Sequence, residues 1–235
     1  MDRKEARKDR RAEPKGESYH HGDLRRALLD AAVEQVKKEG AAVLSLREIA
    51  RRAGVSQAAP YRHFASKEAL LAAVAEEGFR TMRDEMLRVA ARSADEPLER
   101  LRQIGIAYVC FAVEHPAHFR VMFSAGQGCD FPDLDEASTN AFGVLVDAIE
   151  AGLAAGVLVD EPAMSLALSA WSMVHGLASL LIEGRLPSEL GSPEALAAMI
   201  TERLTLGLRP RPAADRVAGK PRSSASARGA RSRGR

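Results

Sequence analysis

Residues 45–64 read SLREIARRAGVSQAAPYRHF, and this stretch decides the fold of the N-terminal part of the chain. Its first half has the spacing of a short amphipathic helix, with apolar residues at Leu46, Ile49, Ala50 and Ala53. Gly54 ends that helix, because glycine readily adopts the positive φ of a helix C-terminus. The residues behind the turn predict a second short helix over 57–64, so the whole stretch predicts a helix-turn-helix.

Local signals refine this motif. Ser45 and Glu48 have the spacing of a capping box at the start of the first helix. Pro60 lacks a backbone donor, so the second helix is expected to start tightly or late. Helical spacing then directs four side chains outward from the second helix, namely Gln57, Ala58, Tyr61 and Arg62.

Basic residues outnumber acidic ones between positions 45 and 67, which suits the phosphate backbone of a DNA duplex. The basic residues are Arg47, Arg51, Arg52, Arg62 and Lys67. Arg51 and Arg52 also fit a solvated helix face. Ala58 and Ala59 are small enough to let base edges come close, but they offer only apolar contact.

The charge of the whole chain is segregated. Residues 1–80 carry a net charge of +4, residues 81–208 carry −10 and residues 209–235 carry +8. Residues 1–18 and 209–235 lack the apolar side chains that ordering requires, so both are expected to be disordered tails. The basic C-terminal tail could be merely solvated or could bind DNA phosphates loosely.

Helical periodicity continues through the rest of the chain and predicts an all-α protein. Further helices are expected at 97–114, 116–124, 133–155, 162–184 and 193–207. Residues 162–182 carry no Asp, Glu, Lys or Arg and are long enough to span a bilayer. Because serines and a histidine interrupt them, we expect a buried helix and no membrane. No apolar stretch follows a basic start, so the expected location is the cytoplasm.

Four short motifs in this order resemble the DNA-binding domain of the TetR family of bacterial transcriptional regulators. They are YHHGDLR at 19–25, GVS at 54–56, YRHF at 61–64 and SKEAL at 66–70. The resemblance implies an all-α homodimer with a three-helix DNA-binding domain, here 19–80, whose motif is 45–64. It also implies a larger helical domain, here 81–208, that binds an effector and dimerises.

The resemblance also implies roles for single residues. Those expected at the major groove are Gln57, Ala59, Tyr61 and His63, with Ala58 and Arg62 on the same surface. Tyr61 and Lys67 are expected to reach phosphate, and Arg47 a guanine or a phosphate. Ser45 could add a backbone contact or act only as a cap, and Tyr61 and His63 could instead be partly packed.

The segment WSMVHG at 171–176 resembles a Trp-x-x-x-His-Gly element of one TetR subgroup. An effector pocket is predicted from an aromatic cluster and this element, although all of these residues also fit a plain core: Tyr108, Phe111, Phe119, Met122, Phe123, Trp171 and His175. A stripe of small residues, Ser165, Ser169, Ser172, Gly176 and Ser179, predicts a close helix contact between subunits. Leu196, Ile200 and Leu204 are predicted as a second apolar seam of that dimer interface.

Other classes of function lack support in the sequence. No phosphate-binding loop, dinucleotide fingerprint or HExxH motif is present, so neither an enzyme nor a cofactor is predicted. His115 and His118 are three residues apart but lack a cysteine or carboxylate at suitable spacing, so no metal site is predicted. We therefore expect a regulator that binds double-stranded DNA, most often a repressor in this family, released by a small-molecule effector. The alternatives are a sequence-neutral DNA-binding protein and a ligand-binding helical protein without an operator.

Overall fold

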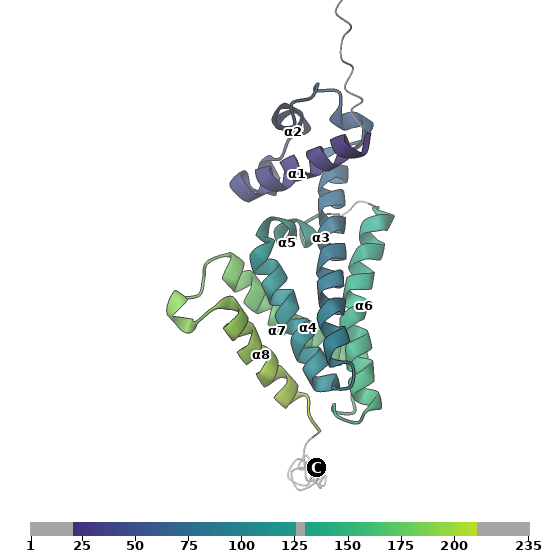
Figure 1. The fold of residues 1–235 in the computed structure, drawn as a ribbon, viewed down its shortest axis with the longest axis vertical. Helices are drawn as coiled ribbons and strands as arrows, with labels where there is room; N and C mark the ends of the chain where they lie inside the picture. Colours follow the sequence, from purple (N-terminus) through teal and green to yellow (C-terminus); the bar gives the residue numbers. More distant parts are fainter. Residues whose placement is uncertain (1–20, 126–129, 211–235) are drawn as a thin grey trace, which may run out of the picture. The chain divides into compact units, whose positions relative to one another are not determined.

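The computed structural model describes residues 21–125 and 130–210, and within them all regular structure is helical (Figure 1). The prediction of an all-α fold is confirmed for these residues. The α-helices are α1 (His21–Glu39), α2 (Leu46–Arg52), α3 (Lys67–Ala90), α4 (Pro97–Glu114), α5 (Pro116–Met122), α6 (Pro132–Ala154), α7 (Ala163–Ile182) and α8 (Pro193–Gly207). The predicted bounds of α4 and α8 are confirmed, because a proline at N1 begins each of them.

The chain divides into two compact units, and their boundary differs from the predicted one. The first unit comprises residues up to Gly78 together with 117–134, and the second comprises 79–116 and the residues from Asp135 onward. Helix α5 therefore belongs to the first unit and not to the predicted domain 81–208. The predicted tail 1–18 and nearly all of the tail 209–235 lie outside the described residues.

Close packing at Gly78 explains why α5 joins the first unit. A Cβ atom on Gly78 would lie 2.6 Å from the sulfur of Met122 and 3.2 Å from Cβ of His118. Glu77, one residue earlier on α3, faces His118 Nε2 at 3.7 Å and accepts a hydrogen bond from Arg26 of α1 at 2.9 Å. Helices α1, α3 and α5 are thus tied together through one carboxylate.

Helix α2 ends as predicted, in a Schellman motif. Gly54 has φ of +68°, the Val55 amide donates to the Ala50 carbonyl, and the Gly54 amide donates to the Arg51 carbonyl. The predicted capping box is wrong, however. Ser45 occupies the N-cap position without a side-chain cap bond. The Glu48 carboxylate, which would complete the box, binds Arg51 and Arg52 instead.

The predicted second α-helix over 57–64 is also wrong. The segment forms a turn, closed by the Ala59 amide donating to the Ser56 carbonyl, and then a single 3₁₀ turn at Pro60–Arg62. Pro60 cannot donate a backbone hydrogen bond, so a regular helix cannot run through it from Gln57. Pro60 and Phe64 are buried, and they anchor this segment to the core of the first unit.

Helices α4, α7 and α8 pack against one another in the second unit. They pack tightly at Gly105 of α4, where a Cβ atom would lie 2.6 Å from Cγ2 of Thr201 and 3.3 Å from Cγ1 of Val174. The buried cluster at this core holds Leu101, Ile149, Leu158, Leu166, Ala167, Ala170, Leu204 and Leu208. Thr201 is fully buried and satisfies its hydroxyl by donating to the Ala197 carbonyl at 2.8 Å.

Helix α7 is not the buried helix that the sequence predicted. By length and composition it is the one described helix that could cross a membrane, a test that a core helix also passes, and one third of its apolar window is buried. One face packs in the core through Leu166, Ala170 and Val174. The opposite face exposes Met164 by 58% and Leu168 by 53% of their surfaces.

Candidate functional site

The surface predicted to meet DNA is largely exposed. Arg47 lies in the first turn of α2, and Gln57, Ala58, Tyr61 and Arg62 are exposed around the 3₁₀ turn. Tyr61 exposes 53% of its surface, whereas its near neighbour Phe64 exposes 4%. The burial of Phe64 and Pro60 therefore holds the intervening polar side chains outward.

Four other residues predicted for this surface are only half-exposed, namely Ser45, Ala59, His63 and Lys67. Ala59 and His63 lie beside the buried anchors, so each presents only part of its side chain. Ser45 is half-buried at the N-cap of α2. All the predicted residues of the motif thus lie in one short region, but some of their side chains are exposed to solvent and others are partly buried.

Ion pairs divide the basic residues of this region into two groups. Glu48 pairs with Arg51 at 2.6 Å and Arg52 at 2.9 Å, and Arg52 also pairs with Glu39 at 2.5 Å. The Arg51 hydrogen bond is the main reason why the pKa of Glu48 falls to about 2. Because these arginines are held by carboxylates on α1 and α2, they fit the solvated face that the sequence left as an alternative.

Two further cations near the motif have partners within the protein. The Lys67 ammonium donates to the Ala42 carbonyl at 2.6 Å, so its predicted phosphate contact would compete with this bond. The Arg25 guanidinium lies 5.5 Å from the centroid of Phe64, in cation–π geometry. Within the described residues, no ion pair is found for Arg47 or Arg62, and these two arginines are the cations most available to a phosphate.

The second unit holds a hydrogen-bonded aromatic cluster. The indole N–H of Trp171 donates to the Tyr108 hydroxyl at 3.1 Å, and that hydroxyl lies 2.7 Å from Nδ1 of His175. A hydroxyl that accepts from Trp171 can donate to Nδ1, which would leave the proton of a neutral His175 on Nε2. Phe142 of α6 packs edge-on against Trp171, with ring centroids 5.9 Å apart.

Burial controls the protonation of this cluster. It raises the pKa of Tyr108 and lowers the pKa of His175, so both side chains are neutral near pH 7. The residues of the predicted Trp-x-x-x-His-Gly element are thereby joined to α4 in one polar chain. The sequence placed Tyr108, Trp171 and His175 in one predicted pocket but offered no signal for Phe142.

The remaining aromatic residues of the predicted pocket are divided between the units. Phe111 is buried in the second unit and packs against His115, with ring centroids 5.0 Å apart. Phe119 and Phe123 pack together in the first unit at the same centroid distance, near the buried Met122. Within each unit these residues pack as core aromatics do.

The small-residue stripe of α7 lies mainly on the surface. Ser165, Ser169 and Ser172 are exposed, and Gly176 and Ser179 are half-exposed. The Ser169 and Ser172 hydroxyls donate to carbonyls one turn earlier, at 3.0 and 2.8 Å. Their polar groups are thus satisfied within the helix, and the stripe presents a shallow, mostly apolar face.

The predicted seam on α8 is wrong. Leu196 and Leu204 are each 7% exposed and face the core of their own subunit, and Ile200 is half-buried. Helical spacing identified a genuine apolar face, but that face packs on α4 and α7. The outer side of α8 instead exposes Met199 and Leu206.

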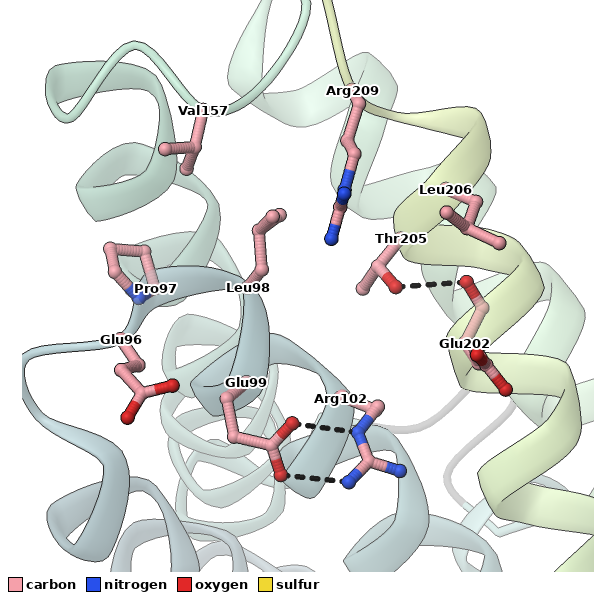
Figure 2. Close-up of a pocket in the computed structure, with 10 residues that line it drawn as sticks. All are labelled: Glu96, Pro97, Leu98, Glu99, Arg102, Val157, Glu202, Thr205, Leu206 and Arg209. Atoms are coloured by element: carbon pink, nitrogen blue, oxygen red, sulfur yellow. Dashed lines mark hydrogen bonds and ion pairs between the residues drawn. The ribbon is translucent and has the colours of Figure 1, made fainter.

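A cavity of 610 Å³, which the sequence did not suggest, lies at the start of α4 and the end of α8 (Figure 2). Glu99 and Arg102 pair on its α4 side, with two contacts of 2.7 and 2.9 Å. Glu202 and Arg209 line its α8 side. Most of the lining residues come from two segments that are far apart in the sequence, at the start of α4 and the end of α8. A local sequence motif therefore could not predict this cavity.

Two family profiles match the chain. Residues 28–74 match the profile described as bacterial regulatory proteins, tetR family. Residues 101–204 match the profile described as tetracyclin repressor-like, C-terminal domain. The first match covers the helix-turn-helix, and the second runs from α4 into α8.

Individual proteins show the same likeness. The HTH-type transcriptional regulator BetI of Rhizobium meliloti (strain 1021) is 35% identical over 106 residues, which cover 44% of this chain and 52% of that relative. The chain spans about half the length of the curated relatives it matches.

Solved structures align over most of the chain. A protein of unknown function from Rhodococcus sp. RHA1 is 32% identical, with a TM-score of 0.73 over 83% of this chain and 100% of that chain. The TetR family regulator PfmR from Thermus thermophilus is 19% identical, with a TM-score of 0.61 over 78% of this chain and 99% of that chain. The likeness to PfmR shows the fold alone.

Proposed function

The chain belongs to the TetR family of bacterial regulatory proteins, and on that premise we propose that it is a homodimeric repressor of transcription. It binds a DNA operator through the helix-turn-helix and leaves it when a small molecule binds the second unit. It acts in the cytoplasm and needs no catalytic residue. Its effector domain falls into the subgroup marked by the Trp-x-x-x-His-Gly element.

The exposed polar surface around the 3₁₀ turn carries the proposal of DNA binding. Arg47 and Arg62 are the available cations, and Gln57 and Tyr61 can hydrogen-bond to base edges or phosphates. A ligand-binding protein without an operator would not need these exposed polar and basic side chains. A sequence-neutral binder would use the cations but would tolerate the loss of Gln57 or Tyr61.

Selection of bound fragments from a random DNA pool with the full chain tests this proposal. We expect a palindromic sequence whose half-sites are about one helical turn apart, since a symmetric dimer places two heads in successive major grooves. R47A and Y61A should then weaken binding of the selected site by about 1–3 kcal/mol each. Lys37→Ala, an exposed cation at the end of α1, serves as the control.

Each outcome of the selection separates the candidates. A pool that shows no enriched sequence, although the protein binds DNA, supports the sequence-neutral alternative. Absence of DNA binding at low salt supports the protein without an operator. A loss in the Lys37→Ala control equal to the loss in R47A would assign the effect of the arginine to net charge alone. Y61A removes no charge, so an unchanged affinity in that variant would remove Tyr61 from the proposed contact.

The aromatic cluster of the second unit supports the proposed effector site. Tyr108, Trp171 and His175 combine apolar surface with convergent polar groups, which is the usual make-up of a small-molecule site. Operator release by candidate ligands should therefore be lost in His175→Ala, while DNA affinity without ligand stays unchanged. Retention of release in this variant would place the effector elsewhere.

The exposed face of α7 supports the proposed dimer contact. Met164 and Leu168 flank the serine stripe, and the hydroxyls of Ser169 and Ser172 are satisfied within the helix. The outer side of α8, which packs against α7, also exposes Met199. A mostly uncharged patch of this kind on a helix pair suits a four-helix contact between two subunits.

The basic segment 209–235 is proposed as a loose phosphate-binding arm. Its removal should leave the selected sequence unchanged, lower the affinity and flatten the salt dependence, since each phosphate contact adds about 0.9 to the logarithmic slope. Titrations of the full and shortened chains at several salt concentrations measure this. Identical slopes would show that the segment contacts no phosphate.

A further inference from the structure

Three side chains that can bind a metal ion come together in the second unit. They are Glu85 of α3 and the consecutive residues Glu114 and His115 at the end of α4. One ligand atom from each residue lies within 4.8 Å of the other two. The set offers two carboxylate oxygens and one imidazole nitrogen.

The end of α4 explains how two consecutive residues share one site. In a continuing helix, neighbouring side chains point about 100° apart, so Glu114 and His115 would face different directions. His115 is the C-cap of α4, with φ of −122° and ψ of 54°, and Pro116 follows it. This departure from helical geometry lets the imidazole lie on the side of Glu114 that faces Glu85.

Packing also orders the imidazole. The His115 ring lies against the buried Phe111 ring, with centroids 5.0 Å apart and an angle of 37° between the planes. Glu85 and His115 are half-buried, and Glu114 is exposed at the mouth of the cluster. A bound ion would therefore reach two partly desolvated ligands and keep an open side toward solvent.

The charge of the cluster suits a cation. Two of its three side chains are carboxylates, and their ligand atoms lie within 4.8 Å of the imidazole nitrogen. Cys110 lies one turn before Glu114 on α4.

We propose that Glu85, Glu114 and His115 bind one divalent transition-metal ion, of the zinc, cobalt or manganese class. Imidazole together with carboxylates suits these ions, whereas an all-oxygen set would suit magnesium or calcium. Water completes the coordination on the open side. The site is separate from the proposed DNA surface and does not depend on the proposed function.

Titration of the full chain with cobalt(II), followed by its visible absorption, and then competition with zinc, tests the site. We expect one ion per chain with an absorption spectrum that reports a nitrogen ligand. Glu85→Gln and His115→Ala should each weaken binding by at least the roughly 10–100-fold that loss of an outer-shell partner costs. Glu85→Gln keeps the shape of the side chain, so it decides the matter if His115→Ala does not fold.

His118→Ala is the matched control, because His118 is half-buried three residues later and faces Glu77 instead. Its variant should bind cobalt(II) as the unchanged chain does. The proposal is overturned if no ion binds, if Glu85→Gln binds unchanged, or if His118→Ala loses binding as strongly as His115→Ala.

Discussion

The segment behind Gly54 and the helix α7 use buried anchors in opposite ways. In the first, Pro60 and Phe64 are buried and the side chains between them that point outward are polar or charged. In α7, Leu166, Ala170 and Val174 are buried and the outward side chains are small or apolar. Polar and apolar surfaces suit different partners, so the first surface fits the proposed contact with DNA and the second fits the proposed contact between subunits.

The largest expected effect comes from removing an anchor of the first surface. Phe64→Ala deletes a ring that is 4% exposed and that carries the Arg25 contact, so we expect a loss of about 3–5 kcal/mol in unfolding free energy. Denaturant unfolding followed by circular dichroism measures it. Met164→Ala, on the exposed face of α7, should leave the unfolding free energy of the monomer almost unchanged. A loss as large as that in Phe64→Ala would contradict the contrast between a buried anchor and an exposed side chain.

A charge placed on the exposed serine stripe of α7 should weaken the proposed contact between subunits. Ser172→Arg puts a cation on the exposed stripe and should weaken dimerisation by at least about 1–3 kcal/mol. Gly176→Leu sharpens the test, because a Cβ at Gly176 meets no atom within 4 Å and the subunit itself has room for a side chain there. Sedimentation at low micromolar concentration should show monomers, whereas intact dimers would show that another surface pairs the chains.

A smaller effect is expected from the polar chain behind α7. Tyr108→Phe removes the hydroxyl that joins Trp171 to His175 and leaves two half-buried polar groups without it. We expect a loss of about 1–3 kcal/mol in unfolding free energy, at the lower end if water replaces the hydroxyl. Phe142→Leu keeps all three polar groups and is the control for lost packing.

The smallest effect concerns pH. Burial lowers the pKa of His175 in the folded state, so the unfolded state takes up its proton first as the pH falls. The contribution of neutral His175 is complete above the ordinary histidine pKa of about 6.5 and is lost as the pH falls through the lower folded value. His175→Gln should therefore flatten the loss of unfolding free energy between neutral and mildly acidic pH, and an unchanged pH profile would contradict this.

Sequence alone was sufficient where one residue determines the backbone. Proline at N1 marked the starts of α4 and α8, and Gly54 marked the end of α2. Pro60 has a larger effect than predicted, because its missing donor reduces the predicted helix to a 3₁₀ turn.

The sequence could not predict features that depend on which other part of the fold a side chain contacts. Helical spacing found the apolar face of α8, but it could not tell that Leu196 and Leu204 pack within their own subunit. Glu85 is far from Glu114 in the sequence, so the usual spacing of metal ligands does not predict their cluster. The predicted capping box lacks its Glu48 half because Arg51 and Arg52 bind that carboxylate, and this contact depends on side-chain placement.

The membership of α5 in the first unit bears on how the protein is made. Met122 covers Gly78, and Glu77 joins Arg26 to His118, so contacts of this unit connect residues far apart along the chain. During synthesis the helix-turn-helix emerges first, but its supporting helix α3 lacks its α5 neighbour until the ribosome has passed residue 122. Such non-local closure slows folding compared with a purely sequential helical domain. The unit proposed to bind DNA is thus completed only after half of the chain has been translated.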